Sequence, residues 1–226
     1  MVRVKICGIR AFEDALFAVT HGADALGFVF ASGPRRIHPR EVRNIIRRIP
    51  PYIQTVGVFV NQKPSHVETV RRYCGLDFVQ LHGEEPPEEC RELMPRVIKA
   101  VRVSDESSVR NAERYKGCVR ALLFDACSED ARGGTGRTFD WDLAVRGKAL
   151  GLPLILSGGL KPSNILQAIR VVRPYAVDVS SGVEKSPGEK SSPLVRRFLH
   201  QVRTEALRKI PNYHNRFGGL GIRSSK

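Results

Sequence analysis

The chain has 226 residues, 42% of them hydrophobic and 27% charged, with a mean hydropathy of −0.23; this predicts a globular protein with a sizeable core. Five scattered cysteines exclude a disulfide framework and a C-x-x-C zinc ribbon, and no apolar run is long enough to span a bilayer. The net charge of +14 comes from basic residues spread along the chain, which favours a generally basic surface over a nucleic-acid site. With no leader-like start, we expect a cytoplasmic protein with reduced thiols.

Short β-branched runs predict eight strands, at 2–9, 25–30, 54–60, 78–83, 97–103, 121–126, 152–159 and 175–182. A segment of helical period follows each of them, the last at 191–209, and the polar segment after 97–103 has the weakest helical pattern. Because the strands are nearly continuous in apolar residues, they indicate a parallel sheet buried on both faces.

Eight βα units in about 205 residues predict a single-domain (β/α)₈ barrel, a TIM barrel, over residues 1–209. An open doubly wound sheet stays possible, because the pattern does not prove closure, although no G-x-G-x-x-G follows the first strand. Residues 210–226 are basic and contain Gly, Asn and Ser without an apolar face, so we expect a poorly ordered C-terminal extension.

The carboxyl ends of the strands are where such a barrel carries its active site. The polar, reactive or glycine residues at these ends are Cys7, Arg35, Asn61, Gln80, His82, Asp125, Gly158, Gly159, Asp178, Ser180, Ser181 and Gly182. This end of the predicted barrel therefore holds the candidate site.

Cys7 and Asp125 end the first and sixth predicted strands, which a ring of eight places across the mouth from each other. A thiol titrates near pH ~8.5 and an aspartate near ~3.9, so each needs surroundings that shift its pKa before the pair works as base and acid. Taken singly, Cys7 reads as a buried hydrophobe and Asp125 as a helix cap. Together they suit a proton-shuttling isomerisation, with Gly8 leaving room beside the thiol.

Glycine-containing turns follow the seventh and eighth predicted strands, SGGL at 157–160 and VSSGVE at 179–184. Loops at these places often hold phosphate, which predicts a small phosphorylated substrate bound by backbone around Gly158, Gly159, Ser180, Ser181 and Gly182. The segment at 132–141, rich in glycine and arginine, reads equally as a lid or as an ordinary connector. The sequence has no cluster of metal ligands.

Two further side chains are candidates for substrate contact. The planar guanidinium of Arg35 suits a carboxylate, whereas the adjacent Arg36 reads as a solvated loop charge. His82 can hydrogen-bond a substrate, although a lone histidine is more often structural.

The chain carries, in this order, KICGI, GFVF with PRRI, VGVFVNQ, VQLHGEE, LLFDA with GGTGRTFDW, LSGGLKPSN and VDVSSGVE. Over about residues 2–205 this set resembles the phosphoribosylanthranilate isomerase family of tryptophan biosynthesis. SGPRRI departs from the family's S-P-R-aromatic-aliphatic pattern, and it leaves Arg35 favoured over Arg36.

The resemblance implies an Amadori rearrangement of N-(5-phosphoribosyl)anthranilate that needs no cofactor or metal. It implies Asp125 as the general acid at the furanose oxygen and Cys7 as the base that removes the C2 proton. It also implies Arg35 at the anthranilate carboxylate and Asp178 near the sugar. From their place at the end of the fourth predicted strand, we expect Gln80 and His82 as further substrate contacts. We expect a monomer or homodimer that binds neither membrane nor nucleic acid.

Two other readings stay open at this stage. One is a neighbouring phosphate-binding barrel, such as indole-glycerol-phosphate synthase or a histidine-pathway sugar isomerase; a first strand that ends in cysteine rather than aspartate counts against the latter. The other is a non-catalytic barrel that binds nucleic acid through its basic surface.

Overall fold

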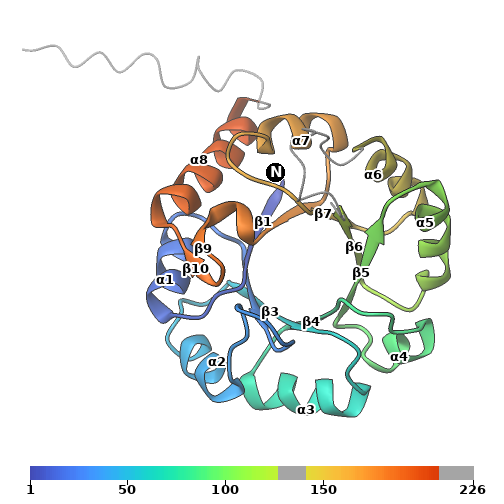
Figure 1. Ribbon diagram of the computed structural model, residues 1–226, viewed down its shortest axis with the longest axis horizontal. Helices are drawn as coiled ribbons and strands as arrows, with labels where there is room; N and C mark the ends of the chain where they lie inside the picture. The colour runs from blue at the N-terminus through green and yellow to red at the C-terminus, as the bar shows by residue number, and fades with distance from the viewer. Residues whose placement is uncertain (127–140, 209–226) are drawn as a thin grey trace, which may run out of the picture.

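The computed structural model describes residues 1–126 and 141–208, in which eight parallel strands close into a barrel inside a ring of helices (Figure 1). The strands are β1 (Arg3–Cys7), β2 (Ala25–Val29), β3 (Gln54–Phe59), β4 (Phe78–Leu81), β5 (Val97–Val103), β6 (Ala121–Ala126), β7 (Leu154–Ser157) and β8 (Ala176–Val179). The helices are α1 (Phe12–Thr20), α2 (Pro39–Ile46), α3 (Pro64–Cys74), α4 (Pro87–Glu92), α5 (Glu106–Asn111), α6 (Trp141–Gly147), α7 (Ile165–Val172) and α8 (Ser192–Arg208). The predicted (β/α)₈ barrel is confirmed.

Closure of the sheet depends on the pairing of its first and last strands. β1 pairs with β8 in parallel, with Lys5 opposite Asp178 and Ile6 opposite Val179. All other neighbours in the ring are consecutive in sequence, so the alternative of an open doubly wound sheet is wrong.

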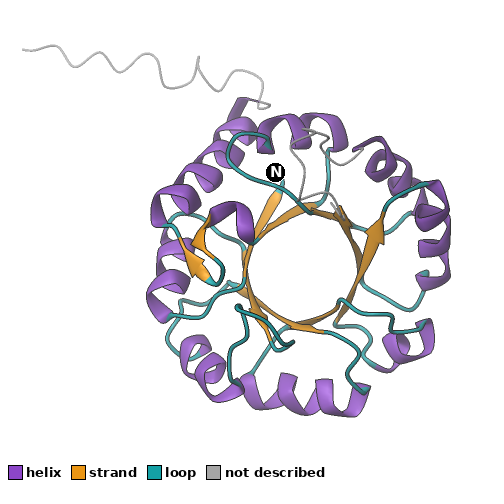
Figure 2. Cartoon of the chain, viewed as in Figure 1, coloured by secondary structure: helices purple, strands orange, loops and turns teal. Residues whose placement is uncertain are grey.

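Apolar side chains fill two separate layers, because successive residues of a strand point to opposite faces of the sheet. Helices surround the barrel (Figure 2), and the larger cluster contains residues of the strands and of these helices. A small cluster made only of strand residues fills the interior: Val56, Phe78, Ile98, Ala100, Ala121, Leu123, Ile155 and Ala176. The interior is therefore a packed core rather than an open channel.

Local sequence signals set several helix ends. Pro39 and Pro64 stand in the first turns of α2 and α3, where the missing N–H costs no helical hydrogen bond. His38 and Glu41 form a capping box at the start of α2. Gly75 ends α3 in the left-handed region, at φ 79°.

The structure differs from the sequence-based expectation in two segments. The polar segment after β5 forms only the short α5, followed by the 3₁₀ helix η1 (Ala112–Tyr115). The segment VEKSPGEK contains a small antiparallel hairpin, β9 (Glu184–Ser186) with β10 (Glu189–Lys190), that was not predicted. The expected extension at 210–226 and nearly all of the expected lid or connector at 132–141 lie outside the described residues.

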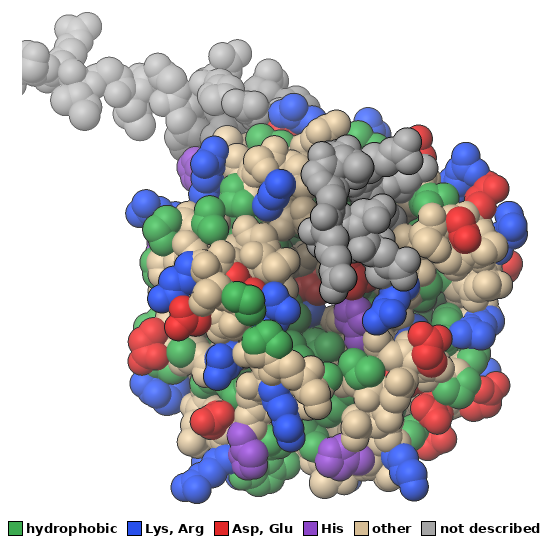
Figure 3. Space-filling model, viewed as in Figure 1, with side chains coloured by type: hydrophobic (Ala, Val, Ile, Leu, Met, Phe, Trp, Pro, Cys, Tyr) green, Lys and Arg blue, Asp and Glu red, His purple; other side chains and the backbone are tan. Residues whose placement is uncertain are grey.

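The face seen in Figure 3 is hollowed near its centre, where acidic, basic and histidine side chains gather. Elsewhere on this face, positive and negative side chains alternate without a continuous basic stripe. Within residues 1–126 and 141–208, no helix is long and apolar enough to cross a membrane.

Candidate active site

Cys7 ends β1, and its side chain is buried, with 7% of the residue exposed. Gly27, its partner on β2, leaves the space for the thiol, because a Cβ there would lie 2.7 Å from Cys7 Sγ and 2.8 Å from Lys5 Cε. The expectation that Gly8 also leaves room beside the thiol stays a prediction. At Gly8, with φ +78°, a Cβ would meet the side chains of Arg35 and Ser180.

Lys5 lies two residues before Cys7 on the same strand and on the same face of the sheet. Its ammonium donates to Asp178 Oδ2 at 2.9 Å and to Gln80 Oε1 at 2.7 Å. Burial alone would lower the pKa of Lys5, but the charges of Asp178 and Cys7 and their hydrogen bonds raise it overall. Lys5 therefore stays an ammonium, and this cation lies beside the Cys7 thiol.

Burial raises the pKa of the Cys7 thiol above its ordinary 9.0, while the charge of Lys5 acts in the opposite direction. Two other buried thiols show what burial does to a cysteine in the helix layer: the pKa rises to about 11 at Cys74 and about 12 at Cys90. Lys5 thus gives Cys7 what a base needs, a nearby cation that favours the thiolate.

Gln80, His82 and Asp125 continue a line of polar contacts across the mouth of the barrel. Gln80 Nε2 lies 2.9 Å from His82 Nδ1, and His82 Nε2 lies 3.0 Å from Asp125 Oδ2. Because β5 lies between β4 and β6 in the ring, the contact between His82 and Asp125 spans the width of one strand. The predicted base and acid are thereby joined through Lys5, Gln80 and His82.

Asp178, on β8, has one carboxylate oxygen paired with Lys5, while Oδ1 is buried with no hydrogen-bond partner among residues 1–126 and 141–208. A buried unpaired carboxylate oxygen is costly, and such atoms are rare in folded proteins. Asp178 therefore presents an acceptor for a donor group within the candidate site.

Arg35 lies in the loop after β2, where Glu184 takes two of its N–H donors. Nε donates to Oε1 at 2.9 Å and Nη2 donates to Oε2 at 2.7 Å. Lys190 also binds Glu184, at 2.8 Å. Burial alone would raise the pKa of Glu184, but the bonds from Arg35 and Lys190 outweigh it and hold that pKa at about 2. The β9–β10 hairpin thus fixes Arg35 near the mouth.

The two glycine-containing loops meet at the same rim. Gly158 and Gly159 both have positive φ, 85° and 62°, and a Cβ at Gly182 would clash with the carbonyl oxygen of Leu160. Ser180 Oγ donates to the Cys7 carbonyl at 3.2 Å, which ties the loop after β8 to β1. Ser181 begins the 3₁₀ helix η3 (Ser181–Val183) beside this contact.

Every residue in the predicted site is described, and those near β1, β4, β6 and β8 form one connected network. Sequence reasoning missed Lys5, Glu184 and Lys190. Lys5 had a usable signal, a lysine inside an otherwise apolar strand two positions before Cys7. Among the described residues, no group of three or more His, Cys, Asp or Glu side chains could hold a metal ion.

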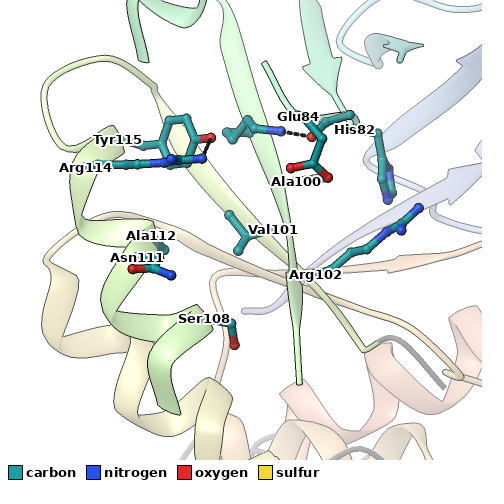
Figure 4. A pocket seen from close by; sticks show the side chains of 12 residues that line it. His82, Glu84, Ala100, Val101, Arg102, Ser108, Asn111, Ala112, Arg114 and Tyr115 are labelled. Atoms are coloured by element: carbon teal, nitrogen blue, oxygen red, sulfur yellow. Dashed lines mark hydrogen bonds between the residues drawn. The ribbon is translucent and has the colours of Figure 1, made fainter. Parts of the chain in front are cut away.

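A cavity of about 190 Å³ extends the mouth on the side of β5 and η1 (Figure 4). His82 and Arg102 lie on one side of it, and Asn111, Arg114 and Tyr115 lie on the other. Arg102 reaches from β5 toward His82, so a positive charge faces the imidazole from the strand between β4 and β6.

The sequence matches the family model of N-(5′-phosphoribosyl)anthranilate (PRA) isomerase over residues 4–201. The isomerase of Geobacter sulfurreducens is 54% identical over 204 residues, which cover 90% of this chain and 99% of that one. The isomerase of Moorella thermoacetica is 50% identical over 217 residues, covering 96% and 94%.

Solved structures show the same similarity in three dimensions. Phosphoribosyl anthranilate isomerase from Thermotoga maritima has a TM-score of 0.84 and 48% identity, covering 90% of this chain and 100% of that one. A further structure, of the isomerase in complex with reduced 1-(o-carboxyphenylamino)-1-deoxyribulose 5-phosphate, has a TM-score of 0.81 and 46% identity with the same coverage. The family match and these identities, over nearly the whole barrel, show that the chain belongs to the N-(5′-phosphoribosyl)anthranilate isomerase family.

Proposed function

We propose that Cys7 and Asp125 are the base and the acid with which this chain performs the isomerase reaction of its family in tryptophan biosynthesis. The substrate is N-(5′-phosphoribosyl)anthranilate, and the product is 1-(2-carboxyphenylamino)-1-deoxyribulose 5-phosphate. The observation that carries the assignment is the placement of Cys7 and Asp125 on β1 and β6, joined by polar contacts across the mouth.

The reaction begins at Asp125. Its carboxyl gives a proton to the furanose oxygen, the bond from C1 to that oxygen breaks, and the anthranilate nitrogen forms a Schiff base with C1. A partly exposed carboxyl suits this role, because 28% of the Asp125 side chain is open to the mouth where the sugar would lie.

The Cys7 thiolate then removes the proton from C2, and the electron pair moves toward the iminium nitrogen to give an enolamine. The enolamine becomes the ketone when C1 gains a proton and the C2 hydroxyl loses one. C1 is thereby reduced and C2 oxidised within one molecule, so electrons balance without a co-reactant. Proton return from the thiol to Asp125 through solvent resets the pair.

Binding roles follow from the positions of the remaining candidates. Glu184 occupies two of the five N–H donors of Arg35, and the others are proposed to hold the anthranilate carboxylate. Asp178 Oδ1, which has no partner in the described structure, is proposed to accept from a sugar hydroxyl. Gln80 and His82 complete the predicted substrate-facing set.

The phosphate is proposed to bind the backbone N–H groups at Gly158–Gly159 and Ser180–Gly182. Support comes from the positive φ angles of the two glycines and from the contact between the two loops. A relative's complex with a deoxyribulose 5-phosphate derivative agrees with a phosphorylated ligand.

We place the reaction in the cytoplasm, supported by the four described cysteines, all of which are free. A monomer or homodimer remains our prediction; a Thermotoga maritima relative is described as dimeric. We propose no nucleic-acid role, because the basic side chains on the face in Figure 3 are interspersed with acidic ones.

The test is turnover of freshly made phosphoribosylanthranilate, followed by loss of its fluorescence, with wild type, Cys7→Ala and Asp125→Asn. Both variants should lose roughly 10²–10⁴-fold in kcat, which is the usual contribution of a positioned acid or base. Cys74→Ala is the matched control, since it removes a buried thiol from α3 and should keep the wild-type rate. A near-wild-type rate for either site variant would refute its role.

A further inference from the structure

We propose that Lys5 and Gln80 fix His82 as the neutral tautomer with its proton on Nε2, so that His82 is a positioning residue for Asp125. The inference rests on the proposed function only for the identity of Asp125 as the acid. It assigns His82, predicted from the sequence as a substrate contact, a different task.

The argument begins at Lys5, whose ammonium can only donate hydrogen bonds. The Gln80 atom that lies 2.7 Å from Lys5 Nζ must therefore be the amide oxygen, Oε1. This contact is buried, with 4% of Lys5 and 1% of Gln80 exposed, so solvent offers the amide no alternative orientation. The orientation of the Gln80 amide is consequently fixed.

The other end of the amide, Nε2, carries two hydrogens and can only donate. It lies 2.9 Å from His82 Nδ1, so Nδ1 must accept and cannot carry a proton. A neutral imidazole then has its proton on Nε2, and this atom lies 3.0 Å from Asp125 Oδ2. The direction of donation runs unbroken from Lys5 through Gln80 and His82 to Asp125.

Charged groups of both signs lie around His82, so the hydrogen-bond geometry and not the charges decides its protonation state. Asp125 faces it from β6, while Arg102 reaches toward it from β5 and Glu84 lies in its own loop after β4 (Figure 4). An imidazolium would need a proton on Nδ1, directed at the Gln80 NH₂ group, and would stand near the positive charge of Arg102. The hydrogen bond from Gln80 Nε2 to His82 Nδ1 thus opposes the imidazolium, because Nδ1 must stay unprotonated to accept it.

The consequence concerns which oxygen of Asp125 holds the transferable proton. Because His82 Nε2–H donates to Oδ2, the acid proton belongs on Oδ1. When Asp125 acts, the Oδ1–H bond breaks and an O–H bond forms at the sugar ring oxygen, while His82 keeps its own proton. The same hydrogen bond then stabilises the carboxylate that remains.

The direct test is the tautomer of His82 in the full-length wild-type chain. A two-bond ¹H–¹⁵N correlation spectrum distinguishes the two neutral tautomers and the imidazolium, and the signal that is lost in His82→Gln assigns the residue. We expect the Nε2–H tautomer near pH 7.5. A proton on Nδ1, in either the other tautomer or the imidazolium, overturns the proposal without requiring any variant to fold.

Gln80→Glu tests the cause of this tautomer. The introduced carboxylate keeps the bond to Lys5 but accepts at His82, so Nδ1 should gain a proton and kcat should fall on the order of tenfold to a hundredfold, with KM changed less. Gln167→Glu makes the same substitution at an exposed position of α7, and it should alter neither the His82 spectrum nor kcat. A Gln80→Glu chain with an unchanged His82 spectrum would contradict the assignment.

Cys7→Ala separates this proposal from the proposed function. It should remove turnover but leave the His82 tautomer as in the wild type, because Cys7 lies outside the contacts that fix the ring. An active Cys7→Ala chain would refute the role of Cys7 as the base. A changed His82 tautomer in this variant would refute the claim that Lys5 and Gln80 fix the tautomer without Cys7.

Discussion

Lys5–Asp178 and Lys99–Glu85 are two buried ion pairs of the same length, 2.9 Å, on opposite faces of one sheet. Lys5 points into the barrel, while Lys99 alternates with the interior residues Ile98 and Ala100 and so points toward the helix layer. The two pairs share chemistry, distance and burial. They differ in how many of their hydrogen-bonding atoms find partners among the neighbouring residues.

The outer pair is fully enclosed by hydrogen bonds. Lys99 also donates to the Gly83 carbonyl at 2.6 Å, and Glu85 accepts from the N–H groups of Asn61 and Gly83. This pair therefore holds together the loops after β3 and β4 and the strand β5, a structural role.

The inner pair is incomplete. Asp178 Oδ1 has no hydrogen-bond partner in the described part of the chain, and the thiol of Cys7 lies beside the ammonium of Lys5. Burial and distance alone therefore do not distinguish a structural ion pair from a functional one. The free acceptor on Asp178 and the reactive thiol of Cys7 mark the inner pair as the functional one.

Removing the inner lysine should have the largest effect. Lys5→Met takes away the cation beside Cys7, so we expect kcat/KM to fall roughly 10²–10⁴-fold at pH 8. The pKa of Cys7 already lies above 9.0, and loss of the lysine raises it further. Since the thiolate is the active form, the rising limb of the pH–rate profile should move to higher pH. An unchanged profile in a folded variant would remove Lys5 from the mechanism.

Removing the outer lysine should instead lower the stability of the fold and leave most of the activity. Lys99→Met leaves the Glu85 carboxylate buried and unpaired, which should lower the free energy of unfolding by about 3–5 kcal/mol in urea titrations. The kcat of the folded fraction should stay within about tenfold of wild type. Adding Glu85→Leu should restore stability in part, because an apolar pair needs no partner charge. A larger loss of kcat than in Lys5→Met would break the comparison.

A third buried lysine, Lys190, pairs with Glu184, and the stability that this pair supplies should depend on pH. Glu184 has a pKa of about 2 in the folded chain against an ordinary 4.5, so its stabilisation is present above pH 4.5 and is lost as the pH falls toward 2. Glu184→Gln should cost about 2 kcal/mol at pH 6. The difference from wild type should shrink steadily in acid unfolding series, and a constant difference would rule out this ion cluster as its source.

The smallest effect is expected where the same contact is exposed. Lys116 and Glu113 also lie 2.9 Å apart, but their side chains are 43% and 64% exposed. Lys116→Met should change the free energy of unfolding by less than about 0.5 kcal/mol, because solvent screens such pairs. A loss comparable to that of Lys99→Met would mean that burial is not what separates these pairs.

The sequence was sufficient for the strands, because each is a short apolar run closed by a polar or glycine residue. Cys7 and Asp125 could be found from the same pattern, since a strand end in a barrel has a defined place at the mouth. Residue type and place in the barrel also indicated Arg35 and the two phosphate loops, and the family resemblance then supplied a role for Asp178 near the sugar; these roles remain predictions.

The contacts between these residues could not be predicted. Lys5 meets Asp178 because β1 pairs with β8, and His82 meets Asp125 across the intervening strand β5. Glu184 lies in a hairpin that has no hydrophobic alternation to indicate it. Sequence patterns report faces and strand ends, whereas side-chain direction across a closed interior depends on the whole fold.

The pairing of β1 with β8 also determines when the site comes into being. Lys5 and Asp178 are separated by 173 positions, so a chain emerging from the ribosome exposes the thiol of Cys7 long before its last strand is made. Throughout this interval Lys5 lacks its carboxylate and the gap in the ring stays open. Barrel closure and completion of the thiol's surroundings are therefore a single event, late in synthesis.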